Sequence, residues 1–467
     1  MTLKLKNTSP EKPAIDLSKT PVSRLFFSYY FPAVVSMLSV TVHQIADGLI
    51  LGQKVGKDGV AAIGLYAPVL IIFIAIVLML MIGGGILFAK NIGLGRPDKA
   101  LEVFQFATTI SLVLGGIVAL SAPWLAEPMT RLLAGNESGK VFTYTLDYTF
   151  WALLWLPIFL LRVLWGGFTN NDQAPKVSRN ATLLASVCNI GLDLLFVMVF
   201  NWGVAGASIA TGISLLIALL YIGFYIAKGK KNLHFQGFRL RFRLGEWQQF
   251  FLLGLPSFAS EIAFAVGFII VNQSLIGYGK LAVAAFGVIN YLSFIFFRFL
   301  VAVFIAMQPI ISFNVGAGKP DRVLAILKFC MLFALGLGCF ITLLGSFTSQ
   351  PLLHLFSGNA SSAFYELANP AFSIYFWLFV GLGVNNVLSL YLQTIGKTLL
   401  AIAMNVTRSI GLVLLFVWFL PSVMGIHGIW AAKPVAELAT ILLMGAFTLV
   451  YRKHYYSHDA IVQQNKN

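Results

Sequence analysis

Long apolar segments constrain the fold of this chain more than any other feature. Each has about 20 residues or more, the length that an α-helix needs to cross the hydrocarbon core of a bilayer, whereas a barrel strand needs only about 10. Lipid offers no hydrogen-bond partners, so the backbone of each segment must pair within itself. We therefore predict an all-α polytopic membrane protein with twelve spans. They lie near residues 25–52, 59–88, 100–124, 140–165, 176–200, 203–227, 247–275, 281–312, 323–347, 363–394, 398–421 and 425–450.

The composition supports a membrane protein and argues against a soluble one. Hydrophobic residues make up 58% of the chain, charged residues only 10%, and the mean hydropathy is +0.86. Soluble domains carry about a quarter of their residues as charged ones, because they need a wet surface. The three cysteines, Cys188, Cys330 and Cys339, all fall inside predicted spans without metal-ligand or redox spacing, so we interpret them as packing residues.

The positive charges are distributed unevenly between the two sides of the predicted membrane. With the N-terminus in the cytoplasm, the inside segments and the span residues counted with them hold 24 Lys and Arg residues, of which Lys397 and Arg408 are counted between spans 10 and 11, and the outside segments hold five. Three more, Arg162, Arg298 and Lys433, lie within spans. By the positive-inside rule, both termini are cytoplasmic. The net charge of +15 is thus a topology signal, and we expect no nucleic-acid partner.

An internal repeat divides the chain into two halves. Residues 91–100 and 314–323 are identical at five of ten positions, with an offset of 223. Pro32 and Pro256 keep an offset of 224. Because each half holds six spans, both halves start on the same side of the membrane, as in parallel-repeat transporters. We predict two six-helix bundles around a central cavity, which suits alternating access better than catalysis.

These halves give the predicted domain boundaries, which follow the chain in order. They are a cytoplasmic N-terminal tail (1–24), an N-lobe (25–227), a basic cytoplasmic linker (228–246), a C-lobe (247–450) and a cytoplasmic C-terminal tail (451–467). The linker is interpreted as an ordinary basic loop, with binding to anionic lipids as the alternative. We expect a multi-pass protein of the plasma membrane, which is the inner membrane in a Gram-negative bacterium.

Polar side chains of three spans share one depth in the outer part of the first half. Asp47 lies about 8 Å below the outer end of its span, and Asp193 and Thr211 lie about 12 Å deep. Asn189 is one helical turn from Asp193 on the same face. Such oxygens can hold a hard cation such as Na⁺, or the carboxyl pair can keep a proton in low dielectric. Both alternatives couple ion movement to conformation.

Other intramembrane polar residues have weaker indications. Pro32 should kink span 1 below Asp47 and act as a hinge. The remaining ionisable groups form two candidate ion pairs, Glu261 with Arg298 across two helices and Lys433 with Glu437 one helical turn apart. We interpret both pairs as structural, with a functional role as the alternative. The chain also contains 41 Phe residues, and an aromatic-walled cavity suits flat lipophilic or cationic solutes.

Several motifs together resemble those of the multidrug and toxic compound extrusion (MATE) family over nearly the whole chain. They are Pro32 with Gln44-Ile-Ala-Asp47, Ala61-Ala-Ile-Gly64, Asn189-Ile-Gly-Leu-Asp193 and Gly203-Val-Ala-Gly206-Ala-Ser-Ile-Ala-Thr211. The resemblance implies a proton or cation site in the N-lobe at Asp47, Asn189, Asp193 and Thr211, with Tyr148 nearby. It also implies that helix 1 bends at Pro32 on protonation.

The chain departs from many of these relatives at two places. His43 and Gln44 stand where an aromatic residue and an Asn are usual, and span 10 carries no acid. His43, one turn from Asp47, can share a proton with it, which favours proton coupling over sodium coupling.

The resemblance implies a secondary antiporter that exports lipophilic or cationic drug-like molecules in exchange for H⁺ or Na⁺. The alternative is a lipid-linked precursor flippase of the same superfamily, which would need Arg162, Arg298 and Lys433 clustered between the lobes. No hydrolase, P-loop or paired-His motif occurs, so we expect no enzyme activity and no cofactor or structural metal. The expected partners are small-molecule substrates and membrane lipids, and the expected state is a monomer.

Overall fold

The computed structural model describes residues 16–135, 139–229, 231–240, 247–358 and 360–455, and within them the regular structure is helical without any β-strand. The helices of the first half are α1 (Val22–Lys54), α2 (Lys57–Gly93), α3 (Pro97–Ala134), α4 (Lys140–Leu154), α5 (Leu156–Asn171), α6 (Pro175–Asp193), the π-helical η1 (Leu194–Val199) and α7 (Gly203–Ala227). Those of the second half are α8 (Gln248–Ile276), α9 (Lys280–Gly316), α10 (Pro320–Ser357), α11 (Ser362–Tyr375), α12 (Leu378–Thr394), α13 (Thr398–Val406), the π-helical η3 (Thr407–Gly411), α14 (Leu412–Phe419), α15 (Pro421–Met424) and α16 (Ile426–Tyr455).

The prediction of twelve spans is confirmed. Among the described residues, eleven helical segments are long and apolar enough to cross a membrane, and the bent pair α4–α5 makes a twelfth. That pair is bent by 52° at Trp155. Pro157 lies in the first turn of α5, where a proline is tolerated because that position needs no backbone N–H donor. In the interior of one continuous helix, the same proline would remove a hydrogen bond, so α4 and α5 form separate helices. Gly115 of α3 leaves room for this corner, because a Cβ there would lie 2.6 Å from the Pro157 Cα.

The repeated motif forms the same turn in both halves. Gly95 and Gly318 adopt φ angles of 70° and 62°, in the left-handed region that glycine tolerates best. Each is followed by a helix with proline in its first turn, α3 at Pro97 and α10 at Pro320. The sequence similarity between the halves therefore reflects a similarity of backbone structure.

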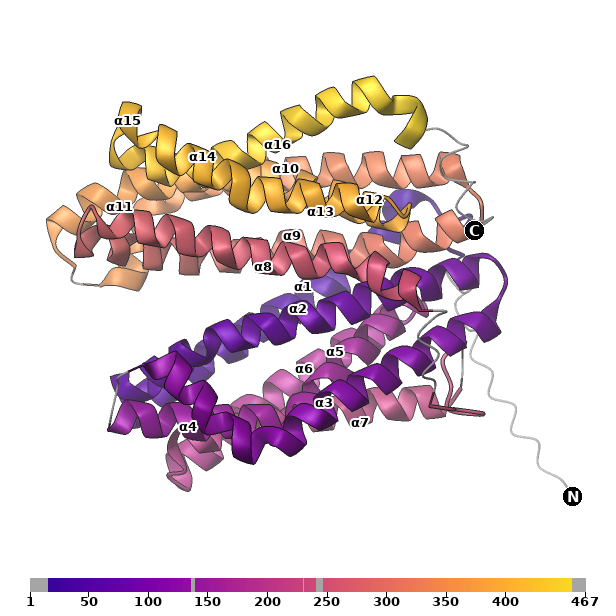
Figure 1. The fold of residues 1–467 in the computed structure, drawn as a ribbon, viewed down its shortest axis with the longest axis horizontal. Coiled ribbons are helices and arrows are strands. Elements are labelled where there is room, and N and C mark those ends of the chain that lie inside the picture. Colours follow the sequence, from indigo (N-terminus) through magenta and orange to yellow (C-terminus); the bar gives the residue numbers. More distant parts are fainter. Residues whose placement is uncertain (1–15, 136–138, 230, 241–246, 359, 456–467) are drawn as a thin grey trace, which may run out of the picture.

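The two lobes, α1–α7 and α8–α16, lie side by side, and α2 and α8 approach each other toward the end where α2 passes into α3 (Figure 1). Glycines make this approach possible. A Cβ on Gly83 would lie 2.3 Å from the carbonyl oxygen of Phe250, and one on Gly254 would lie 2.0 Å from the carbonyl oxygen of Met79. In the predicted orientation this is the cytoplasmic end. The lobes are therefore closed against each other on that side, and α2 and α8 diverge toward the other (Figure 1).

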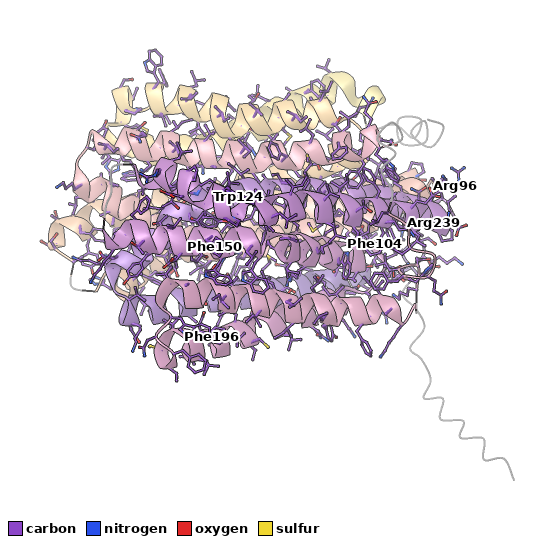
Figure 2. All side chains as sticks on the ribbon, turned by 60° about the horizontal axis from the view of Figure 1, so that its bottom comes forward. Arg96, Phe104, Trp124, Phe150, Phe196 and Arg239 are labelled. Atoms are coloured by element: carbon purple, nitrogen blue, oxygen red, sulfur yellow. The ribbon has the colours of Figure 1, made fainter. Side chains whose placement is uncertain are left out.

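Basic and large apolar side chains lie on different parts of the molecular surface. Arg96, between α2 and α3, and Arg239, in the linker, lie at the same end of the bundle (Figure 2). Large apolar side chains cover the outside of the helices, including Trp124, which is 76% exposed, and Phe347, which is 84% exposed. Such a surface is stable only against lipid.

The segment before α1 is attached to the opposite lobe. The carbonyl oxygen of Leu17 accepts hydrogen bonds from Asn314 Nδ2 at 3.2 Å and from Arg322 Nε at 3.0 Å. Arg322 also donates to the carbonyl oxygen of Thr20. The side chain of Leu17 is 2% exposed. The entry to α1 thus rests on the α9–α10 corner of the C-lobe, while residues 1–15 of the predicted tail lie outside the described residues.

The described part of the linker is attached to the N-lobe. One carboxylate oxygen of Asp172 accepts hydrogen bonds from the backbone N–H and the side-chain amide of Asn232, and the other accepts one from the backbone N–H of Leu233. Burial raises the pKa of Asp172, and these hydrogen bonds oppose that effect. The predicted linker residues 230 and 241–246 lie outside the described residues, as do residues 456–467 of the C-terminal tail.

Candidate cation-coupling site

The two predicted carboxylates come from different helices, α1 and α6. Asp193 is the last residue of α6, where the chain changes from α-helix to the π-helical turn η1. A π-turn places the following residues on a rotated face, and such turns are frequent at functional sites. Asp193 is 1% exposed and Asn189, one turn earlier, is 2% exposed. Nothing in the residue pattern around Asp193 predicted this change of helix type.

The side chains of Asp47 and Asp193 lie close enough to each other to interact directly. As ionised groups, both would be acceptors only, and within the described structure no donor reaches either oxygen of Asp193 or Oδ1 of Asp47. Asp193 is buried and Asp47 is half-buried, so in the ionised state the two neighbouring carboxylates repel each other and are poorly solvated. A proton shared between them, or a cation bound to them, removes both costs.

Asn189 and Thr211 add oxygen and amide groups from α6 and α7. Asn189 Nδ2 donates to Thr211 Oγ1 at 3.4 Å, and Thr211 Oγ1 donates to the carbonyl oxygen of Ala207 at 3.0 Å. Asn189 Oδ1 is buried without a donor in the described structure. These two residues therefore meet as predicted.

Tyr148 of α4 lies close enough to Asp47 and Asp193 to interact with both electrostatically. Its ring packs edge-on against Tyr66 of α2, with 5.3 Å between the ring centroids. Tyr148 and Thr211 also line a small cavity of about 80 Å³ inside the N-lobe. The cavity walls come from α2, α4, α5 and α7, and include Tyr66, Phe73, Trp155, Phe159, Ser208 and Leu215. The predicted neighbour of the carboxyl pair is thus beside it.

The side chains of His43 and Gln44 form hydrogen bonds with residues outside the pair Asp47 and Asp193. His43 Nδ1 lies 2.9 Å from Ser186 Oγ of α6, so this hydrogen bond, rather than one to Asp47, orients the imidazole. Gln44 Oε1 accepts a hydrogen bond of 3.1 Å from Arg298 of α9, in the other lobe.

α1 continues through the buried Pro32 as one uninterrupted helix, and Ser36 donates to the Pro32 carbonyl oxygen at 2.9 Å.

The C-lobe holds a second buried polar cluster, and one member was missed by the sequence prediction. Arg408 lies within the predicted span 398–421 but was counted among the cytoplasmic charges between spans 10 and 11, and that count is wrong. It lies in η3, inside the eleventh span, and is 3% exposed. Its guanidinium is 3.4 Å from Glu437 and donates to Asn386 at 3.0 Å. The signal available was its place ten residues into the apolar run that begins at Thr398.

This arrangement corrects the predicted ion pairs. Glu437 pairs with Arg408 and not with Lys433, because its carboxylate turns toward η3 and α12. The Lys433 ammonium instead lies 4.0 Å from the ring centroid of Phe264. Glu261 and Arg298 interact electrostatically, although Arg298 donates its hydrogen bond to Gln44.

The three cations that a lipid-linked precursor flippase would need in one place have different contact partners in the described structure. Arg162 donates a hydrogen bond of 2.5 Å to Thr182 inside the N-lobe. Arg298 lies between the lobes, and Lys433 is buried in the C-lobe.

Comparison with known proteins places this architecture in a family. The family model described as MatE matches residues 32–195 and again residues 256–419. The two matches have the same length and are offset by 224 residues, the offset of Pro32 and Pro256 and within one residue of that of the repeated motif.

Individual relatives match over almost their entire length. The FAD transporter of Shewanella oneidensis is 23% identical over 439 residues, covering 92% of this chain and 94% of the relative. The multidrug export protein MepA of Staphylococcus saprophyticus is 24% identical over 438 residues, covering 93% and 94%.

Solved structures share the fold at low sequence identity. An outward-facing multidrug resistance MATE transporter of the MOP superfamily superposes with a TM-score of 0.88 at 18% identity, covering 96% of this chain and 100% of that chain. A MOP superfamily transporter from Pyrococcus furiosus gives a TM-score of 0.86 at 18% identity, covering 95% and 100%. The family model matches more than half of the chain, in both lobes, and this protein therefore belongs to the MATE family of transporters and is not an enzyme.

Proposed function

We propose that this protein is a proton-coupled antiporter that exports lipophilic or cationic drug-like molecules across the plasma membrane, with both termini in the cytoplasm. The observation that carries the proposal is the pair Asp47 and Asp193, a half-buried and a buried carboxyl group from separate helices that interact with each other, while no donor in the described structure reaches either oxygen of Asp193 or Oδ1 of Asp47. Such a pair is stable when it holds a proton and repulsive when it does not. Proton release and uptake therefore change how strongly α1 is held against α6.

The proposed cycle follows from this geometry. A proton entering from outside binds between the carboxyl groups and draws α1 toward α6. Pro32 then supplies the place where α1 changes its bend, because a helix lacks one internal hydrogen bond at proline. This movement expels the substrate from between the lobes, and rocking of the lobes then returns the site to the cytoplasmic side.

Sodium is the second candidate for the coupling ion. Its support is the presence of Asn189 and Thr211 beside the carboxyl pair, because amide and hydroxyl oxygens together with carboxylates suit a hard cation. The His43 imidazole beside Asp47 favours the proton. Neither alternative requires a cofactor.

The substrate class is supported by the relatives and by the positions of the buried cations. The Staphylococcus saprophyticus relative is described as a multidrug export protein and the Shewanella oneidensis relative as an FAD transporter. The different contact partners of Arg162, Arg298 and Lys433 favour this class over a lipid-linked precursor flippase. One chain contains both lobes and the seam between them, so we propose that it acts as a monomer.

Everted membrane vesicles test the function directly. Uptake of ethidium into acidified vesicles is expected for the unmodified protein, and loss of uptake is expected for Asp193→Asn at equal expression. Asp98→Asn, an exposed carboxylate at the start of α3, is the matched control and keeps full activity. Dissipating the pH gradient should stop uptake, whereas a sodium pulse should not drive it. Full uptake by Asp193→Asn would remove the proposed coupling site.

A further inference from the structure

A buried polar stripe runs along α6 of the N-lobe. Its members recur three or four residues apart, so they lie on one face of the helix, and each is between 1% and 4% exposed. They are Thr182, Ser186, Asn189 and Asp193. Each meets a polar side chain of another helix, and these partners are, in the same order, Arg162 of α5, His43 of α1, Thr211 of α7 and Asp47 of α1. In the proposed orientation, the stripe continues from the coupling pair toward the cytoplasm.

The contact between His43 and Ser186 lies on the cytoplasmic side of the coupling pair. His43 is one helical turn before Asp47 on α1, about 6 Å closer to the cytoplasmic end, and Ser186 is seven residues before Asp193 on α6, about 10 Å closer. His43 Nδ1 lies 2.9 Å from Ser186 Oγ, and the ring also interacts with the carbonyl oxygen of Ser39. An imidazole gains and loses a proton near neutral pH more readily than any other side chain. The group next to Asp47 on this side is therefore one that can accept its proton.

His43 differs from Asp193 in its access to the seam between the lobes. Asp193 is 1% exposed, whereas His43 is half-buried. Arg298 of the C-lobe lies within electrostatic reach of His43. The residue after His43, Gln44, is exposed and bonds to Arg298 across the seam. Water that enters the seam from the cytoplasm therefore meets His43 before it meets Asp193.

The charges around His43 favour transfer of a proton over its retention. Asp47, on the same helix, would attract a positively charged imidazole. Arg162 of α5 and Arg298 of α9 would repel it, and the facing group of α6, Ser186, is neutral. Like charges in a partly buried site interact strongly, so an imidazolium beside two guanidinium groups is unfavourable. A proton that reaches His43 is thus passed on.

We propose that His43 carries the coupling proton from Asp47 to the cytoplasmic side, and that Ser186 positions its ring. This role rests on the proton coupling of the proposed function. The proton leaves a carboxyl oxygen of Asp47 and bonds to a ring nitrogen of His43, which leaves a carboxylate and an imidazolium. When the lobes are open to the cytoplasm, one N–H bond of the imidazolium breaks, water takes the proton, and the neutral imidazole is restored.

Ethidium uptake into acidified everted vesicles tests the route, because the cytoplasmic face of the protein is then in contact with the medium. At a fixed pH difference, His43→Gln is expected to slow uptake about tenfold or more, since a positioned group for proton transfer is lost. Concentrated HEPES in the medium should restore the rate, because a mobile base that enters the open seam replaces the imidazole. The unmodified protein and the control His354→Gln, which removes an exposed histidine of α10, should show neither effect.

An equilibrium measurement separates release of the proton from its binding. Acidification of the purified protein is expected to displace bound ethidium equally from the unmodified protein and from His43→Gln, because both keep the carboxyl pair, but not from Asp193→Asn. Ser186→Ala is the second variant for the uptake assay. It should slow uptake in the same HEPES-sensitive way, whereas Ser186→Thr keeps the normal rate because it retains the hydroxyl.

Several outcomes decide against the route. Normal uptake by His43→Gln, or slow uptake that HEPES does not restore, overturns it. Loss of acid-induced ethidium displacement in His43→Gln also overturns it, since the residue would then serve proton binding and not release. If His43→Gln does not fold, Ser186→Ala decides, and a normal or HEPES-insensitive rate contradicts the proposal. Full uptake by Asp193→Asn refutes the coupling site itself, so the two failures are distinguishable.

Discussion

Arg298 on α9 of the C-lobe donates a hydrogen bond of 3.1 Å to Gln44 on α1 of the N-lobe. Gln44 lies three residues before Asp47 on the same helix, so this contact joins the coupling helix to the opposite lobe. A charged hydrogen bond contributes about 1.5–3 kcal/mol to the conformation that contains it. The bond therefore stabilises the arrangement seen here, in which the lobes are closed against each other at the end where α2 passes into α3.

Arg298→Leu is expected to shift the protein toward the conformation that is open to the cytoplasm, because it removes this bond. The measurement is the rate at which maleimide labels a cysteine introduced at Gln308, a residue that is 4% exposed and packs against Gly85 of the other lobe. The background lacks the three native cysteines. Arg131→Leu is the control, since Arg131 pairs with Glu127 of α3 and lies over the Phe142 ring of α4 in the same lobe, at a site where its side chain is 69% exposed. Equal labelling in both variants would contradict the prediction.

Gly254→Ala is expected to abolish export while Gly287→Ala leaves it intact. A Cβ on Gly254 would lie 2.0 Å from the Met79 carbonyl oxygen across the seam, whereas a Cβ on Gly287 meets nothing within 4 Å. Overpacking of this kind costs about 1–3 kcal/mol, and at Gly254 this cost would destabilise the closed arrangement of the lobes. Ethidium uptake into everted vesicles checks the prediction, and a normal rate for Gly254→Ala would show that the glycine contact is dispensable.

Thr211→Val separates proton coupling from sodium coupling. The substitution keeps the shape of the side chain and removes one oxygen next to Asn189. A shared proton between Asp47 and Asp193 needs no such oxygen, so proton-driven uptake should stay within about twofold of the unmodified rate. A bound sodium ion would lose a ligand, and the concentration of sodium needed for half-maximal uptake would then rise steeply. Thr211→Ser, which retains the oxygen, is the control.

Glu437→Leu is expected to destabilise the protein by about 3–5 kcal/mol, because it leaves Arg408 charged and buried without its partner. Both side chains are almost inaccessible, with 3% exposure for Arg408 and 7% for Glu437. Glu102→Ala breaks the surface pair with Lys99, whose side chain is 62% exposed, and should cost about 1 kcal/mol or less. Unfolding of the purified variants, followed by fluorescence against temperature, compares the two. Similar losses would refute a structural role for the buried pair.

The sequence by itself determined the number of spans, the two halves and the depth of the coupling residues. Apolar length and helical rise are local properties, and they place Asp47, Asp193 and Thr211 in one layer without knowledge of any neighbour. The one-turn spacing of Asn189 and Asp193 likewise follows from the helix alone. The repeat required only a comparison of the chain with itself, and the matching turns at Gly95 and Gly318 bear it out.

Only the tertiary structure decided which way each side chain faces. Depth along a helix does not give rotation about its axis, so His43 turned out to meet Ser186 and Arg298 to meet Gln44. The partner of Glu437 depended on the π-helical turn η3, in which Arg408 lies, and no residue pattern indicated that turn. Pairing between helices depends on how packed surfaces fit together across the bundle, and this information is spread over segments far apart in the chain.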